Sequence, residues 1–193
     1  AGLGLYRTEF LFLQRNELPD EDEQFRIHRD VVLGMSGRPV TIRTLDLGAD
    51  KADRSGLVLA NEDNPALGLR GVRLSLANGD LFDTQLRAIV RASGYGPVRV
   101  LVPMISNREE IVAVRKRLKR VADKLRKEGA EVADDIPLGA MIEVPAAAIA
   151  LHAFVDIVDF LSIGTNDLVQ YLLAADRNND ALGELYSPLN PGV

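Results

Sequence analysis

Residues 98–105 read VRVLVPMI, a run of apolar residues broken only by Arg99 and the proline. Such a run is typical of a parallel strand, because helices cover both faces of a parallel sheet and leave no polar side. Similar segments lie downstream at residues 136–144 and 157–163, and upstream at residues 3–12 and 39–47. We therefore predict five buried strands along the chain.

Helical patterns separate these strands, at residues 20–33, 81–91 and 108–128 and from Pro145 through AAAIALHAFV. The longest pattern repeats apolar residues at intervals of three and four, and Ser106 with Glu109 predicts a capping box before it. Its other face carries eight Lys and Arg side chains between residues 115 and 127. A solvated helix face is the ordinary interpretation of these charges, and a docking surface for an acidic partner is the alternative.

Strands that alternate with helices predict an α/β fold with a parallel sheet and right-handed crossovers. Two architectures fit, a doubly wound open sheet and a (β/α)8 barrel. Five strands in 193 residues average about 39 residues per unit. Eight such units would need roughly 310 residues, which is within the range of barrels. The pattern alone does not separate the two architectures.

Composition excludes several classes of protein. A hydrophobic fraction of 47% with 26% charged residues is not that of a disordered chain. The net charge of -5 argues against general nucleic-acid binding, and the absence of cysteine excludes disulfides and thiolate metal sites. No apolar run is long enough to span a membrane. The chain begins on a strand-like segment with neither an initiator Met nor a signal peptide, so we expect a fragment of a longer protein.

Charged and amide side chains follow the predicted strands. In chain order they are Arg7, Glu9, Arg43, Asp46, Glu143, Asn166 and Asp167, with Arg70 and Arg177 in or beside connections. The carboxyl ends of parallel strands meet at one edge, where α/β proteins bind their ligands. An arginine there needs either a carboxylate of its own chain or an anionic ligand. The internal alternative pairs Arg7 with Glu9, or Arg43 with Asp46.

The combination of arginines with carboxylates predicts a more specific site. Guanidinium groups match phosphate and carboxylate oxygens in bidentate geometry. Glu143 and Asp167 are hard oxygen donors on neighbouring strand ends, and Mg²⁺ typically takes one or two carboxylates together with substrate phosphate. Asn166 can donate its amide to an anionic oxygen. Residue chemistry therefore predicts a site for a small phosphate ester bound with Mg²⁺, without naming the ester.

Other candidate sites are weaker. The chain has no Walker-type phosphate loop and no dinucleotide fingerprint. The acidic loop at residues 46–53 lacks the spacing of a calcium loop. His28 and His152, the two histidines, fall in predicted helices, and we interpret both as packing or surface residues. A zinc site is not expected.

Long motifs of the chain resemble one family. They are LYRTEFLF at residues 5–12, IRTLDLGADK at 42–51, NPALGLRGVR at 64–73, LVPMI at 101–105, MIEVPAAA at 141–148 and DFLSIGTNDLVQYLLAADRNND at 159–180. In this order they resemble the C-terminal phosphoenolpyruvate-binding barrel of the enzyme I family of the bacterial sugar phosphotransferase system. Pyruvate phosphate dikinase and phosphoenolpyruvate synthase share this barrel.

The resemblance implies a fold and a set of site residues. Residues 1–193 would form one incomplete (β/α)8 barrel domain, strands two to six of eight, that binds phosphoenolpyruvate and Mg²⁺. Arg7 and Arg43 would hold the phosphate, with Arg70 adding positive charge. Glu143 and Asp167 would ligate the metal. Asn166, Asp167 and Arg177 would belong to the substrate site, where Asn166 and Arg177 complete the phosphate and carboxylate contacts.

The resemblance also implies partners. In the family the phosphoryl group passes to a histidine on a separate N-terminal domain and then to a small carrier protein that serves sugar uptake. A cysteine on a later strand acts as the acid that donates a proton to the pyruvate enolate. We accordingly expect the complete protein to be a cytoplasmic, homodimeric phosphotransferase. We expect no catalytic residue within the fragment and no activity of the fragment alone. A phosphoenolpyruvate-sensing or dimerisation fragment, and the barrel of a dikinase-type enzyme, are the alternatives.

Overall fold

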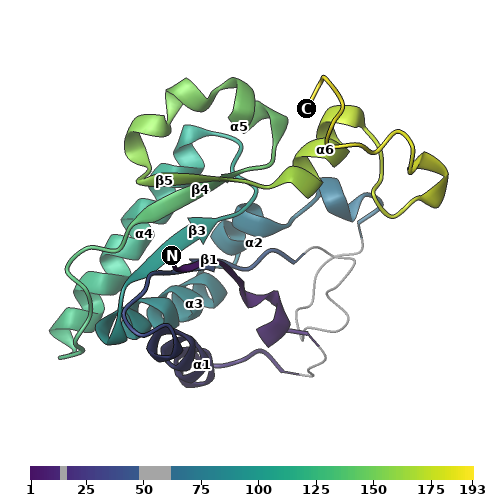
Figure 1. Ribbon diagram of the computed structural model, residues 1–193. Coiled ribbons are helices and arrows are strands. Elements are labelled where there is room, and N and C mark those ends of the chain that lie inside the picture. The colour runs from purple at the N-terminus through teal and green to yellow at the C-terminus, as the bar shows by residue number, and fades with distance from the viewer. Residues whose placement is uncertain (14–16, 48–61) are drawn as a thin grey trace.

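The computed structural model describes residues 1–13, 17–47 and 62–193. Within them, five parallel strands form one sheet: β1 (Leu3–Arg7), β2 (Val40–Arg43), β3 (Val98–Val102), β4 (Leu138–Ile142) and β5 (Phe160–Ile163). Their spatial order, β1-β2-β3-β4-β5, is also their order in the chain. A doubly wound sheet reverses its order at a switch point, so this order excludes that alternative. The curled sheet confirms the prediction of an incomplete (β/α)8-type barrel (Figure 1).

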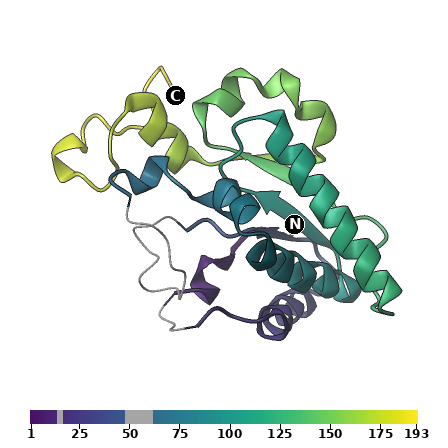
Figure 2. The same cartoon turned by 180° about the vertical axis from the view of Figure 1, so that it is seen from behind.

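Helices connect the strands along the outer side of the sheet. They are α1 (Glu21–Gly34), α2 (Gly71–Ala77), α3 (Gly79–Ala92), α4 (Arg108–Lys127), α5 (Pro145–Ile149) and α6 (Thr165–Leu173). Seen from behind, α3 and α4 lie in front of the sheet and cover it (Figure 2). None of the helices in the described ranges has the length and apolar character needed to cross a membrane.

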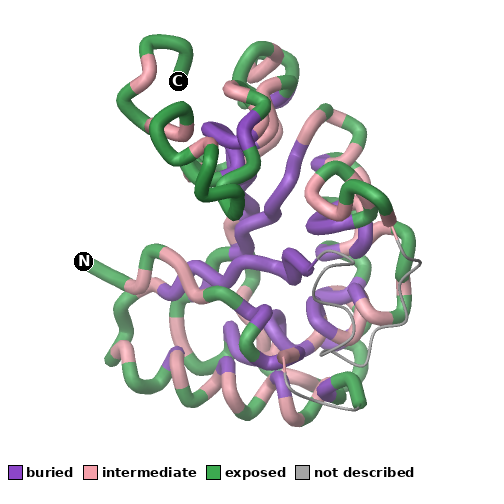
Figure 3. Tube along the Cα trace, turned by 90° about the vertical axis from the view of Figure 1, so that its right-hand side faces the viewer, coloured by how far each residue is buried: buried purple, intermediate pink, exposed green. Residues whose placement is uncertain are grey.

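The core lies between the sheet and these helices. Val40, Ile42, Val100 and Val102 of the central strands are fully buried and belong to one hydrophobic cluster with residues of α3 and α4. Buried segments accordingly follow the strands and the inner faces of the helices (Figure 3). The sheet is therefore a fixed platform from whose carboxyl edge the site side chains project.

The first strand is shorter than predicted. The sequence predicts a strand over residues 3–12, but β1 ends at Arg7 and a 3-10 helix, Thr8–Leu11, follows. Thr8 donates its hydroxyl to the Arg43 carbonyl at 2.9 Å, and the Phe12 N–H bonds to the Glu9 carbonyl. These bonds turn the chain across the end of β2. Glu9 is therefore carried toward the neighbouring strand and away from its own arginine, Arg7.

Two predictions about helices were wrong in detail. The capping box before α4 pairs Asn107 with Glu110, through Glu110 N–H to Asn107 Oδ1 at 3.0 Å and Asn107 N–H to Glu110 Oε2 at 3.2 Å. The predicted partner Glu109 takes no part, although Ser106 also donates to Glu110. The helix that begins at Pro145 ends at Ile149, and short 3-10 turns follow. Helices α2 and α6 were not predicted.

The basic face of α4 is largely paired within the molecule. Arg115 lies 3.0 Å from Asp159, Arg120 lies 2.7 Å from Asp83, and Arg117 donates to the Gly79 carbonyl at 2.7 Å. These contacts tie α4 to α3 and to the segment before β5. They favour the ordinary interpretation of this face over a docking surface.

Candidate functional site

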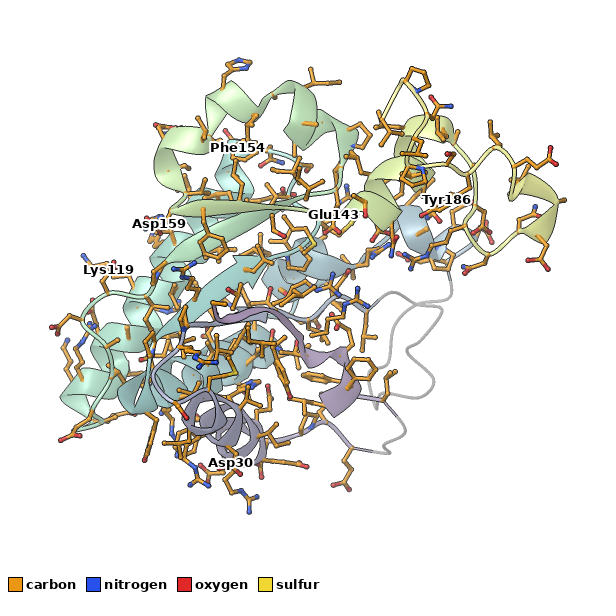
Figure 4. The ribbon with its side chains drawn as sticks, in the orientation of Figure 1. Asp30, Lys119, Glu143, Phe154, Asp159 and Tyr186 are labelled. Atoms are coloured by element: carbon orange, nitrogen blue, oxygen red, sulfur yellow. The ribbon has the colours of Figure 1, made fainter. Side chains whose placement is uncertain are left out.

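Six of the nine charged and amide residues singled out from the sequence come together in buried positions at the carboxyl edge of the sheet: Glu9, Arg43, Asp46, Arg70, Glu143 and Asp167. Arg7 and Arg43 are register partners at the ends of β1 and β2. Glu143 immediately follows β4, and Figure 4 shows it beyond the strand end, close to α6. The first turn of α6 supplies Asp167, because the chain turns into this helix directly after β5.

Three buried carboxylates form the centre of the site. Asp46, Glu143 and Asp167 each offer an oxygen, and these oxygens lie within 4.8 Å of one another. Burial, together with the charges of Asp46 and Asp167, raises the pKa of Glu143 to about 7. Three hard oxygen donors at this spacing suit a divalent cation of the Mg²⁺ type. The residues present therefore fit a magnesium ion, and a cation would relieve the repulsion among the three carboxylates.

Glu143 is held in place by the backbone around it. The Met104 N–H donates to Glu143 Oε1 at 2.6 Å, and Met104 adopts a left-handed conformation with φ of 60°. On the other side, a Cβ on Gly164 would lie 2.4 Å from Glu143 Oε2. Only glycine leaves room for the carboxylate here. The loop after β3 and the turn after β5 therefore fix the Glu143 side chain from both sides.

Arg70 lies beside the carboxylates and joins two of them. Its Nε and Nη2 donate to Asp46 at 3.1 and 2.9 Å, and its Nη1 donates to Asp167 at 3.0 Å. Nη1 also reaches the Tyr171 hydroxyl at 3.2 Å. Burial alone would lower the pKa of Arg70, but the Asp46 and Asp167 carboxylates outweigh it and raise the pKa. Arg70 is therefore a permanently charged group at the centre of the site.

Arg43 is paired less completely. Its Nη2 donates to Glu9 at 2.8 Å, and its Nη1 lies 3.5 Å from Asp46. The pKa of Arg43 is raised because Glu9 and Asp46 more than offset its burial. Buried Arg43 Nε and Glu9 Oε2 have no hydrogen-bond partner within the described residues. Unpaired buried polar atoms are costly, so these two mark positions where a polar ligand atom would be stabilised.

The remaining predicted residues lie at the rim. Arg7 is exposed and has no ion-pair partner among the described residues. Asn166 is exposed on the first turn of α6, where its carbonyl accepts from Tyr186 at 2.7 Å. Arg177 is exposed, with its Nη1 3.9 Å from Asp167 Oδ2. The structure therefore places these three around the centre rather than in it.

A cavity of about 510 Å³ opens beside the centre. Its wall includes Asp46, Arg70, Tyr171 and Arg177, together with the segments around Pro65 and Ala174. Tyr171 closes one side, because its hydroxyl donates to the Ala66 carbonyl. This volume is within the range of small-molecule sites, and the wall carries both basic side chains, Arg70 and Arg177, and acidic ones, Asp46, Asp63 and Asp176.

Comparison with known proteins now adds to the geometry. Residues 1–193 match the family described as "PEP-utilising enzyme, PEP-binding domain", where PEP is phosphoenolpyruvate. The chain belongs to this family. The resemblance found in the sequence is thereby confirmed at the level of the family.

The chain is also similar to proteins named phosphoenolpyruvate-protein phosphotransferase. It is 49% identical over 192 residues to the protein of Geobacillus stearothermophilus, covering 100% of the chain and 33% of that relative. It is 50% identical over 191 residues to the protein of Listeria monocytogenes serovar 1/2a (99% of the chain, 33% of the relative), and 47% identical over 192 residues to that of Staphylococcus aureus (100% and 33%). The chain spans about a third of the length of these curated relatives.

Asp46 and Glu9 form more contacts within the site than the sequence suggested. Asp46 was interpreted as a counter-ion of Arg43, but it bonds mainly to Arg70 and contributes to the carboxylate cluster. The alternative that pairs Arg7 with Glu9 is wrong, because Glu9 bonds to Arg43 and accepts from the Asp46 N–H at 3.0 Å. The sequence feature that pointed to both residues was their position at the carboxyl end of a predicted strand. Their true partners depend on which strands are neighbours.

The histidines of the PEP-binding domain lie outside the site. His28 is fully buried in α1, with its ring 5.8 Å from that of Tyr6 in an edge-on arrangement. Burial lowers its pKa to about 4, and neither ring nitrogen has a partner in the described part of the chain. His152 is exposed. These positions agree with the prediction that both are packing or surface residues.

Proposed function

We propose that this PEP-binding domain binds phosphoenolpyruvate together with Mg²⁺ at the carboxyl edge of its sheet. The observation that carries the proposal is the position of two buried arginines, Arg43 and Arg70, against the cluster of Asp46, Glu143 and Asp167. Cations and metal-binding carboxylates side by side match a ligand that carries a phosphate, a carboxylate and a bound metal. The family and its phosphotransferase relatives support the same ligand.

The roles of the residues follow from their positions. Arg43 and Arg70 would neutralise the phosphate, with Arg7, Asn166 and Arg177 reaching the ligand from the rim. Glu143 and Asp167 would hold the metal. When bound, Mg²⁺ supplies positive charge to the phosphate oxygens and the departing enolate. Phosphoryl transfer has a loose transition state, so holding the phosphate in a fixed array of cations is most of what a protein contributes.

We further propose that the complete protein is a phosphoenolpyruvate-protein phosphotransferase. In this proposal the phosphoryl group passes to a histidine outside these residues and then to a carrier protein in sugar uptake, within a homodimer. Support comes from the identity of 47% to 50% with proteins of that name across nearly the whole chain. His28 is buried and has no hydrogen-bond partner among the described residues, which is unsuited to a phosphoryl acceptor and is consistent with an acceptor elsewhere.

Calorimetric titration with phosphoenolpyruvate in the presence of MgCl₂ tests the binding proposal. We expect binding by the unmutated chain and a loss of about 100-fold in affinity for Arg43→Ala, since a charge-assisted bidentate contact contributes about 3 kcal/mol. Arg38→Ala, an exposed arginine before the other end of the same strand, is the matched control and should bind normally. Equal affinity of the two variants would refute the site. Pyruvate formation by the complete gene product tests the phosphotransferase activity.

A further inference from the structure

A buried glutamine of α3 reaches the ends of the first two strands. Gln85 is 1% exposed. Its Oε1 accepts from the Leu45 N–H at 2.9 Å, and its Nε2 donates to Thr8 Oγ1 at 3.2 Å. Thr8 in turn donates to the Arg43 carbonyl at 2.9 Å. One side-chain amide therefore links β1, β2 and α3 through buried hydrogen bonds.

The amide takes the place of a missing stretch of sheet. The β1–β2 ladder ends with the pair Arg7 and Arg43, and the segments that follow are not paired as strands. Thr8 and Leu45 therefore have no partner from the other strand in a ladder. A glutamine amide offers one carbonyl acceptor and one N–H₂ donor, so it can satisfy both segments as a peptide group would.

The residues held in this way are neighbours of the site. Thr8 lies between Arg7 and Glu9, and Leu45 precedes Asp46. Glu9 and Asp46 are the two carboxylates that hold Arg43. A shift of either strand end would therefore move the Arg43 guanidinium, although among the described residues Gln85 itself forms no hydrogen bond with that group. None of the assigned roles accounts for a buried glutamine whose amide oxygen and nitrogen both form hydrogen bonds at this point.

We infer that Gln85 is a positioning residue for the anion-binding arginine Arg43, acting through Thr8 and Leu45. The inference rests on the proposed function, because it concerns the same site. It adds that the affinity of the site for phosphoenolpyruvate depends on a side chain of an outer helix. Side chains that orient ligand-binding groups typically change affinity about 10- to 100-fold when they are removed.

Gln85→Met tests the inference, with Gln24→Met as the matched control. Gln24 is also fully buried, and its amide donates to the Pro19 carbonyl at 2.9 Å in α1's own entry loop. Both variants replace a buried amide by a thioether of similar length, so both lower the melting temperature. In titrations with phosphoenolpyruvate and MgCl₂, well below melting, we expect about 10-fold weaker binding for Gln85→Met. Gln24→Met should bind as the unmutated chain does.

The outcomes separate the inference from the proposed function. Equal affinity of Gln85→Met and the unmutated chain overturns the inference and leaves the proposed function intact. No binding by the unmutated chain overturns the proposed function, and the inference with it. If Gln85→Met does not fold, Thr8→Val and Thr8→Ser replace it. Thr8→Val, which loses the hydroxyl, should bind about 10-fold more weakly than Thr8→Ser, which keeps it; equal binding of the two overturns the inference.

Discussion

Glu143 is the residue whose protonation we expect to control the proposed metal site. Its pKa is raised to about 7 by burial and by the neighbouring Asp46. Because Mg²⁺ binds the carboxylate and not the acid, a proton competes with the metal below that pH. We expect Mg²⁺ affinity to rise between pH 6 and 8 with release of a proton, as measured by calorimetry in buffers of different ionisation enthalpy. An affinity that is flat over this range would contradict the assignment.

The Glu143 carboxyl also affects the stability of the fold, which should fall as the pH rises, whereas the affinity for Mg²⁺ should rise. A carboxyl whose pKa is raised on folding binds more protons in the folded state, so its contribution is full below the ordinary value of 4.5 and is lost as the pH rises through about 7. Without metal, Glu143→Gln should therefore melt at a higher temperature than the unmutated chain at pH 8, and about equally at pH 4. A lower melting temperature at pH 8 would contradict this.

Gly164 sets the space available to that carboxylate. A Cβ at this position would lie 2.4 Å from Glu143 Oε2 and 2.7 Å from its Cβ. We expect Gly164→Ala to displace the carboxylate and to weaken Mg²⁺ binding about 10-fold, as loss of ligand orientation typically does. Gly4→Ala is the control, because nothing lies within 4 Å of a Cβ at Gly4. Unchanged metal titration of Gly164→Ala would show that Glu143 is not a ligand.

At the scale of elements, α4 depends on its first turn. Glu110 accepts from the N–H groups of Ser106 and Asn107, whereas Glu109 belongs only to the acidic first turn. We expect Glu110→Ala to lower the free energy of unfolding by about 1 kcal/mol, the usual loss when a cap is removed. Glu109→Ala should cost about 0.5 kcal/mol, a typical helix-dipole contribution. Urea unfolding measures both, and equal losses would argue against the capping box.

The elements themselves were predictable to different degrees. The runs at residues 98–105 and 136–144 each contain a strand, because burial on both faces leaves an apolar segment that can be read locally. The short helices α2 and α6 leave no long periodic stripe, and both begin beside residues of the site. The strand pattern alone did not predict the sequential strand order, since that order depends on contacts between distant segments, whereas the family resemblance implied it. It follows from the register of each parallel pair.

The site residues were also predictable only in part. Arg43, Glu143 and Asp167 were predictable because side chains at the carboxyl ends of parallel strands share one edge. Of the partners of these residues, only the Arg43–Asp46 pair was anticipated. Glu9 pairs with Arg43 because the chain turns into a 3-10 helix after Arg7, and nothing in LYRTEFLF marks that turn. Gln85 was missed because a glutamine inside an amphipathic helix resembles any partly polar position.

At the scale of the whole molecule, His28 links acidity to stability. Its pKa falls to about 4 through burial, from an ordinary 6.5. The unfolded state therefore binds the proton first, and stability is lost as the pH falls from about 6.5 toward 4. Between pH 7 and 5 we expect a loss of about 2 kcal/mol from this group. His28→Leu should remove it and the exposed His152→Leu should not, as followed by urea unfolding at both pH values.

The internal pairing of Arg70 has a consequence for selectivity in a crowded solution. The Arg70 guanidinium already pairs with the Asp46 and Asp167 carboxylates. A free sulfate or acetate would have to displace one of these carboxylates and would leave it buried without a counter-ion. An anion that binds together with a divalent cation is different, because the cation can bind the displaced carboxylates. We therefore expect the site to favour an anion bound together with a divalent cation over the same anion alone.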